Sequence, residues 1–176
     1  MTRRINIWVA LLCAMCVSCA CVAESGPVHW KLAAKETNAA AGSGPQVTAL
    51  VTASIESGWH LYALDQGQGG PVPTSITIPP DQIFELAGEI QQPQPLMKFD
   101  TNFNLPVRYF EGNVTFTVPL RVKAKPTGSL TAVKVRVAYQ ICNDQTCLPP
   151  TSLDLTAPVG RSSPHGDIAH SKHAHS

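Results

Sequence analysis

The stretch Val114-Thr115-Phe116-Thr117-Val118-Pro119-Leu120-Arg121-Val122 places an apolar residue at every second position. This period puts alternate side chains on the same face of an extended chain, which is typical of a strand with one buried face. The same alternation recurs from Val133 to Tyr139 and from Val47 to Ile55. Together these three segments predict long, half-buried strands and an all-β fold.

Shorter extended segments and turns lie around the three long strands. We expect further strands over 29–34, 59–62, 75–78, 107–110 and 151–157. Ile83 to Ile90 is ambiguous, and Gln91 to Leu105 is predicted to be a long loop because it is polar and contains prolines. About seven to nine short strands separated by turn signals predict a β-sandwich.

The composition agrees with a single domain that has a possible tail at either end. The chain has 176 residues, 15 prolines, 14% charged residues and a formal net charge of +1. This balance gives no support for nucleic-acid binding, which usually requires a basic patch or stripe. A domain of roughly 150 residues buries about 68–70% of its unfolded surface, so it does not need a disulfide simply to fold.

The amino-terminal segment is typical of a secretory signal peptide. Arg3 and Arg4 precede an uncharged, largely apolar stretch from Ile5 to Ala23, and Cys21-Val22-Ala23 resembles a cleavage site. We therefore expect residues 1–23 to be removed on export. A retained membrane anchor and a lipoprotein cleavage before Cys19 or Cys21 are the alternatives.

The six cysteines fall into two groups. Four lie in the apolar amino-terminal segment, where cysteine behaves as a small hydrophobic residue: Cys13, Cys16, Cys19 and Cys21. Only Cys142 and Cys147 remain in the predicted exported chain. A lone pair in an oxidising compartment predicts a disulfide and not a metal site.

The cysteine pair lies in the run Tyr139-Gln140-Ile141-Cys142-Asn143-Asp144-Gln145-Thr146-Cys147-Leu148-Pro149-Pro150. An antiparallel hairpin would place the two cysteines opposite each other, within the Cβ separation of about 3.5–4.5 Å that a disulfide needs. A structural disulfide closing so small a loop stabilises the fold by only about 2 kcal/mol. A reactive pair near a tight turn is the other interpretation, because exchange requires access to one sulfur.

This run resembles that of the amino-terminal periplasmic domain of the transmembrane thiol:disulfide interchange protein DsbD, a family also described as disulfide bond corrector domains. The resemblance covers roughly His29 to Val159. Its other motifs are Gly58-Trp59-His60-Leu61-Tyr62, Pro71-Val72-Pro73-Thr74-Ser75 and Tyr109-Phe110-Glu111-Gly112. It implies an immunoglobulin-like β-sandwich over 27–159 with a cysteine-bearing hairpin.

The resemblance also implies a function. Members of the family relay two electrons through the cysteine pair, so Cys147 would form mixed disulfides and Cys142 would resolve them. The implied donor is the thioredoxin-like domain of a membrane thiol:disulfide transporter. The implied acceptor is a periplasmic disulfide isomerase or a cytochrome c maturation protein. Because the disulfide itself carries the electrons, no cofactor is expected.

Supporting roles follow from the same resemblance. Phe103 lies in the region of a mobile cap loop that shields the pair, and Tyr62 matches a tyrosine close to the pair. We expect Tyr139 to pack under the hairpin. His60 either tunes a thiolate as a nearby cation or is an ordinary strand histidine, and Asp144 is expected to serve the turn.

Two other functions are compatible with the residues. The sandwich could be a non-catalytic protein-binding module that contains a permanent disulfide. Residues 160–176 are predicted to be a disordered tail. A second alternative is a metal-handling protein, in which the imidazoles of this tail bind a metal ion weakly: His165, His170, His173 and His175. The sequence shows no multi-span membrane region and no thioredoxin-like domain, so we expect the module to meet its electron donor by diffusion.

Overall fold

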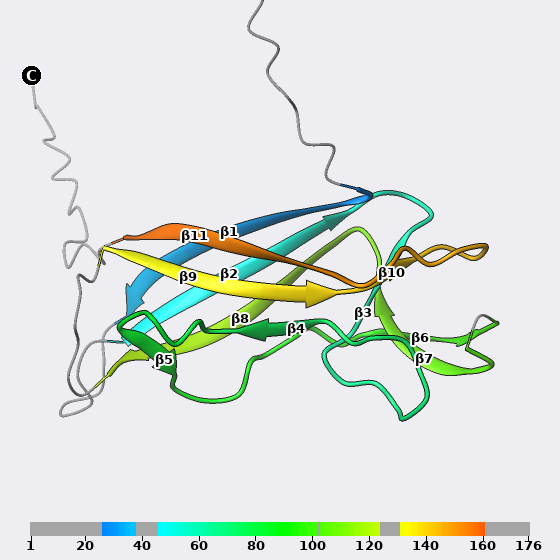
Figure 1. The fold of residues 1–176 in the computed structure, drawn as a ribbon, viewed down its shortest axis with the longest axis horizontal. Coiled ribbons are helices and arrows are strands. Elements are labelled where there is room, and N and C mark those ends of the chain that lie inside the picture. Colours follow the sequence, from blue (N-terminus) through cyan, green and yellow to red (C-terminus); the bar gives the residue numbers. More distant parts are fainter. Residues whose placement is uncertain (1–25, 38–45, 102, 124–130, 161–176) are drawn as a thin grey trace, which may run out of the picture.

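The computed structural model describes residues 26–37, 46–101, 103–123 and 131–160. Every regular element in these ranges is a strand, and Figure 1 labels them. The strands are β1 (Val28–Thr37), β2 (Gln46–Ile55), β3 (His60–Tyr62), β4 (Ser75–Thr77), β5 (Phe84–Leu86), β6 (Leu96–Asp100), β7 (Leu105–Phe110), β8 (Asn113–Val122), β9 (Ala132–Tyr139), β10 (Ile141–Cys142) and β11 (Thr151–Gly160). Among the residues described, no helix is long and apolar enough to span a membrane.

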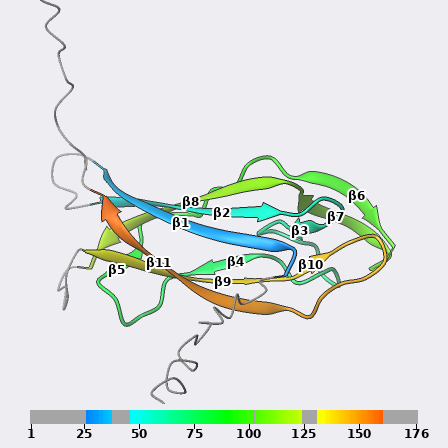
Figure 2. The same cartoon turned by 90° about the horizontal axis from the view of Figure 1, so that it is seen from above.

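Seven strands form a bent sheet in the order β4-β9-β11-β1-β2-β8-β5. β1, β2 and β8 make one layer, β4 and β9 make the facing layer, and β11 passes from one layer to the other (Figure 2). β11 pairs along most of its length with β9 and then meets β1 in parallel at Ala34 and Val159. This arrangement confirms the predicted all-β, immunoglobulin-like sandwich.

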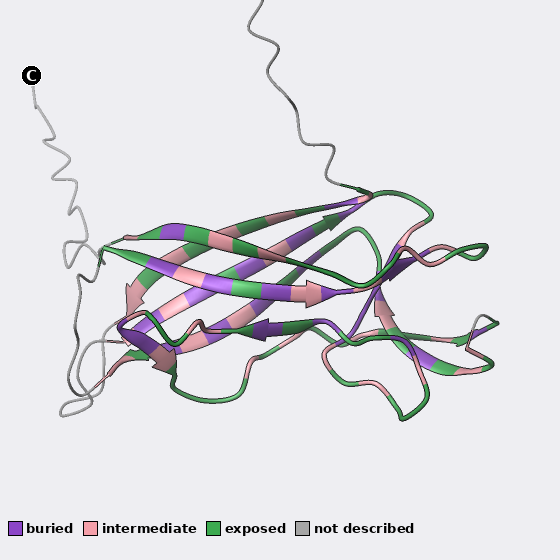
Figure 3. Ribbon diagram, in the orientation of Figure 1, coloured by how far each residue is buried: buried purple, intermediate pink, exposed green. Residues whose placement is uncertain are grey.

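The long alternating segments build the core between these layers. Along β2, β8 and β9, buried residues alternate with more exposed ones (Figure 3). Val51 lies opposite Phe116 across β2 and β8, and both are fully buried. Phe116 also contacts Trp30 and Phe110, with ring centroids 6.4 and 5.8 Å away. The period-two pattern of the sequence therefore corresponds to burial in the sandwich.

A smaller sheet lies at one end of the molecule, in the order β10-β3-β7-β6 (Figure 1). β9 ends at Tyr139 in the large sheet, whereas β10 begins at Ile141 in the small one. The chain therefore changes sheets at Gln140, two residues before the first cysteine. This crossing places the cysteine-bearing hairpin at the end of the sandwich.

The predicted loop over Gln91 to Leu105 is wrong in part, because it contains β6. This strand forms the edge of the small sheet and leaves Leu96, Met97 and Phe99 between 52% and 67% exposed. The sequence of such a strand does not alternate between apolar residues that become buried and polar residues that stay exposed. The described residues also form eleven strands where seven to nine were expected, since strands of two or three residues are too short to show a period.

Candidate functional site

Cys142 and Cys147 face each other across the tip of the hairpin. They form an isolated antiparallel bridge with Cα atoms 4.0 Å apart, and their sulfurs are joined in a disulfide of 2.09 Å. The predicted opposition of the two cysteines is confirmed. The attacked and leaving sulfurs of an exchange reaction would therefore both lie at this tip.

Local hydrogen bonds shape the turn between the cysteines. The Asn143 side-chain Oδ1 accepts from the backbone N–H groups of Gln145 and Thr146, at 2.9 and 2.8 Å. The Asn143 N–H donates to the Thr146 carbonyl at 2.9 Å. An asparagine side chain commonly stabilises a turn in this way. Asn143 thus holds the turn that we expected Asp144 to serve.

Gln140 fixes the base of the hairpin. Its side-chain amide N–H donates to the Leu148 carbonyl at 3.3 Å, and its Oε1 accepts from the Val72 N–H at 3.1 Å. A backbone bond from the Leu148 N–H to the Ile141 carbonyl, at 3.0 Å, closes the same base. The cysteine loop is therefore tied both to itself and to the segment before β4.

The two cysteines differ in exposure. Cys142 is fully buried, whereas Cys147 is half-buried. Cys142 forms a small apolar cluster with Tyr62 and Val107, separate from the main core, and further residues pack against it: Phe103, Leu105, Tyr109 and Cys147. Of the two, Cys147 is the more exposed residue.

Phe103 reaches this cluster from the turn between β6 and β7. The two strands pair up to Asp100 and Leu105, on either side of this turn. Asn104 adopts a positive φ of 55°, a conformation that asparagine tolerates better than most residues. The Phe103 ring meets the Tyr62 ring edge-on, with centroids 6.1 Å apart. The structure thus brings Phe103 and Tyr62 together beside Cys142.

Tyr62 lies fully buried in β3. Its hydroxyl donates to Asp100 Oδ2 at 2.7 Å. Burial, with this hydrogen bond next in importance, raises the pKa of Tyr62 well above its ordinary value. The phenol therefore stays protonated and links β3 to the last residue of β6, from which the Phe103 turn departs.

Tyr139 lies apart from the cysteine cluster. It is buried in the main core, where its ring lies 5.2 Å from that of Trp30 at an angle of 52°. Tyr139 precedes Gln140, the residue that fixes the hairpin base. Its position is that of a core residue beneath the hairpin, not of a residue beside the sulfurs.

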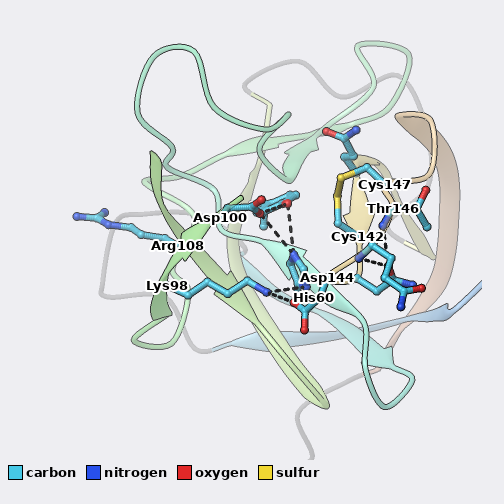
Figure 4. A network of polar contacts seen from close by, with 12 residues as sticks. His60, Lys98, Asp100, Arg108, Cys142, Asp144, Thr146 and Cys147 are labelled. Atoms are coloured by element: carbon cyan, nitrogen blue, oxygen red, sulfur yellow. Dashed lines mark hydrogen bonds and ion pairs between the residues drawn. A yellow bond between two sulfur atoms is a disulfide. The ribbon is translucent and has the colours of Figure 1, made fainter. Parts of the chain in front are cut away.

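A chain of polar contacts runs from the cysteine loop through the small sheet (Figure 4). Lys98 Nζ lies 3.0 Å from Asp144 Oδ1 and 3.4 Å from His60 Nδ1. His60 Nε2 lies 3.3 Å from the Tyr62 hydroxyl. Burial, followed by the nearby Lys98 ammonium, lowers the pKa of His60. The imidazole is therefore neutral near pH 7, so the cation beside the cysteine loop is Lys98.

Sequence reasoning missed Lys98 and Asp100. Both belong to β6, which was predicted to be a loop, and both point to the same face of that strand because they are two residues apart. Their distance from the cysteines along the chain gives no hint of their contact with His60 and Tyr62. Only the pairing of β6 with β7, next to β3, brings them to the site.

Among the described residues, no group of three or more His, Cys, Asp or Glu side chains could hold a metal ion. The histidines of the predicted tail, like the predicted signal peptide, lie outside the described residues. The metal-binding alternative therefore stays a prediction.

Of two solved structures that are similar to this chain, one agrees with its fold. The N-terminal periplasmic domain of ScsB from Proteus mirabilis superposes with a TM-score of 0.53 at 15% identity, covering 76% of this chain and 47% of the ScsB chain. The reduced N-terminal domain of DsbD from Neisseria meningitidis has a TM-score of 0.45 and 18% identity, covering 62% of this chain and 80% of that one. No curated protein sequence is significantly similar to this chain.

The sequence profile of one family matches well over half of the chain. The family is described as "Thiol:disulfide interchange protein DsbD, N-terminal", and the match covers residues 31–157. This range includes both cysteines, the Phe103 turn and all strands except the ends of β1 and β11. The chain belongs to the family of DsbD N-terminal domains, and its Cys142–Cys147 disulfide lies in a thiol–disulfide exchange domain.

Proposed function

We propose that this protein relays two electrons between exported proteins through the Cys142–Cys147 pair. The observation that carries the proposal is the asymmetry of the pair: Cys142 is fully buried and Cys147 is half-buried at the tip of a hairpin. A purely structural disulfide closing this loop would stabilise the domain by only about 2 kcal/mol. The separate apolar cluster around Cys142 would otherwise have no evident purpose at the end of the sandwich.

In the proposed reaction, a donor thiolate attacks Cys147 Sγ. The bond between the two cysteine sulfurs breaks, and its electron pair leaves on Cys142 Sγ as a thiolate. A second donor thiolate then attacks the donor sulfur of the mixed disulfide, which releases Cys147 and leaves the donor oxidised. The reduced pair passes two electrons to an acceptor disulfide by the reverse sequence.

The partners and compartment belong to the same proposal. The donor would be the thioredoxin-like domain of a membrane thiol:disulfide transporter. The acceptor would be a periplasmic disulfide isomerase or a cytochrome c maturation protein. A periplasmic location is supported by the signal-like segment over 1–23 and by the family match. The ring contact between Phe103 and Tyr62 supports a shielding role for Phe103 and a supporting role for Tyr62.

The roles of the two cysteines can be tested by trapping a mixed disulfide. A thioredoxin-like protein that retains only its attacking cysteine is mixed, as its activated disulfide, with each reduced variant, in which serine also replaces the four amino-terminal cysteines. Cys142→Ala should give a covalent complex, because Cys147 remains accessible. Cys147→Ala should give almost none. Equal trapping by both variants would contradict the assigned roles.

One observation favours the alternative of a protein-binding module with a permanent disulfide. β6 exposes three apolar residues along the edge of the small sheet, and two of them, Met97 and Phe99, share a face: Leu96, Met97 and Phe99. Exposed apolar groups that gather in this way often mark a protein contact. A binding module predicts that the disulfide resists reduction, whereas the relay predicts a readily exchanged pair.

A further inference from the structure

The position of the Lys98 ammonium is fixed by two residues that both neighbour Cys142. Asp144, at 3.0 Å, follows Cys142 by two residues in the cysteine loop. His60, at 3.4 Å, is the direct partner of Cys142 in the pairing of β3 with β10. Directly opposed residues of an antiparallel pair have side chains on the same face, with Cβ atoms about 4.5–5.5 Å apart. The ammonium is therefore held next to the end of β10.

Ring contacts also hold the same group. Lys98 Nζ lies 5.1 Å from the centroid of the Tyr109 ring, a favourable cation–π distance. The His60 ring meets the Tyr109 ring edge-on, with centroids 5.5 Å apart. Lys98 is thus enclosed by side chains from β3, from β7 and from the cysteine loop. Its side chain is only 26% exposed.

The hydrogen-bond chain assigns the tautomer of His60. The Tyr62 hydroxyl donates its hydrogen bond to Asp100, so its oxygen accepts from His60 Nε2–H. The lone pair of Nδ1 then faces Lys98 and accepts from the ammonium. In this tautomer the neutral imidazole orients Lys98 and adds no charge of its own.

The other charged and titratable groups around His60 come from several elements. Asp100 comes from β6, Asp144 from the cysteine loop, Glu111 from the turn after β7, and Tyr62 and Tyr109 from β3 and β7. The Asp144 side chain is 90% exposed, so solvent screens its charge. Asp100 lies on the Nε2 side of the ring, where it accepts from Tyr62. The largely covered cation on the Nδ1 side is Lys98.

We propose that Lys98 is the cation that stabilises the Cys142 thiolate, and that His60 is the positioning residue that holds Lys98 in place. This inference rests on the proposed exchange function, in which Cys142 leaves as a thiolate when Cys147 enters a mixed disulfide. Complete burial disfavours a thiolate at Cys142, and a nearby cation favours it. Lys98 therefore makes a buried sulfur usable as a leaving group and as the resolving nucleophile.

The test measures the pKa of Cys142 without any redox partner. In the full chain, serine replaces Cys147 and the four amino-terminal cysteines, so that Cys142 is the only thiol. Its ionisation is followed by the ultraviolet absorbance of the thiolate as the pH is raised. Lys98→Met should raise the pKa of Cys142 by about one unit, which is about tenfold less thiolate at a given pH below it. Lys98→Arg, which keeps the positive charge, should retain most of the thiolate that Lys98→Met loses.

A matched control is Lys134→Met. Lys134 also forms an ion pair, with Asp81 at 3.8 Å, and its side chain is 43% exposed on β9 in the other sheet. This variant should leave the pKa of Cys142 unchanged. His60→Asn, which keeps an acceptor near the Nδ1 position, should change the pKa less than His60→Leu does. An unchanged pKa in Lys98→Met, or an equal rise in Lys134→Met, would overturn the proposal.

A second variant decides the matter if Lys98→Met no longer unfolds cooperatively. Asp144→Asn keeps an oxygen acceptor for Lys98 but removes the opposing charge, so it should lower the pKa of Cys142. A rise in this variant would contradict the role of Lys98. Because no partner takes part, these results do not depend on whether the protein relays electrons. If the relay failed its own test, the pKa result would still stand. If the pKa test failed, the result of the relay test would still stand.

Discussion

Phe103→Ala is the substitution that tests the cap most directly. Phe103 is half-buried in the turn between β6 and β7, and its ring meets Tyr62 edge-on at 6.1 Å. Tyr62 and Cys142 belong to the same small cluster, against which Phe103 and Cys147 pack. Removing the ring uncovers this cluster without touching either cysteine. We expect the disulfide to react faster with a small reductant.

The size of the effect follows from the ring contact. Aromatic pairs in this geometry stabilise a structure by about 0.5–1.5 kcal/mol beyond the area that they bury. If this contact holds the cap closed, its loss raises the open population by a factor of roughly 2 to 13, since RT is about 0.6 kcal/mol. The rate of reduction by a small thiol should rise by the same factor, because attack requires the open form.

The assay follows reduction of the disulfide by dithiothreitol under pseudo-first-order conditions. Phe99→Ala is the matched control, because Phe99 lies on the neighbouring strand with 60% of its surface exposed. Tyr62→Phe is a second control that keeps the ring but removes the hydroxyl. The reasoning is refuted if Phe103→Ala reacts at the wild-type rate, or if Phe99→Ala accelerates the reaction equally.

Two further predictions concern stability. Replacing Cys142 and Cys147 together by serine should lower the free energy of unfolding in guanidinium by about 2 kcal/mol, as the small loop requires; a loss of more than about 5 kcal/mol would favour a structural disulfide. Because the folded-state pKa of His60 is lowered, its neutral imidazole contributes fully to the free energy of unfolding above the ordinary histidine pKa of about 6.5. This contribution is lost as the pH falls from 6.5 towards the folded-state pKa. His60→Asn should flatten this decline in thermal unfolding curves recorded below pH 6.5, and an unchanged slope would contradict the neutral buried imidazole.

The sandwich was predictable because its long strands each bury one face. The alternation from Val114 to Val122 maps directly onto β8, whose apolar residues face the core. The opposition of Cys142 and Cys147 was also predictable, since strand signals flank a short polar turn. The crossing at Gln140 was not, because nothing in the sequence separates the end of β9 from the start of β10.

The polar surroundings of the cysteine pair could not be predicted from sequence. β6 exposes Met97 and Phe99 on the outer face and directs Lys98 and Asp100 inward, which reverses the pattern expected of a half-buried strand. His60 was a candidate cation by residue type alone. Its burial beside Lys98 lowers its pKa and leaves it neutral, an effect that depends on tertiary contacts. The charge near the pair therefore belongs to a residue from another part of the chain.

The reduction potential of the Cys142–Cys147 pair, measured in equilibrium with glutathione, tests the central proposal most directly. The four amino-terminal cysteines are replaced by serine so that one couple titrates. The relay predicts a value between roughly −180 and −270 mV, in the range of proteins that exchange disulfides. A value below about −300 mV would contradict it and would mark the pair as a structural disulfide of a binding module.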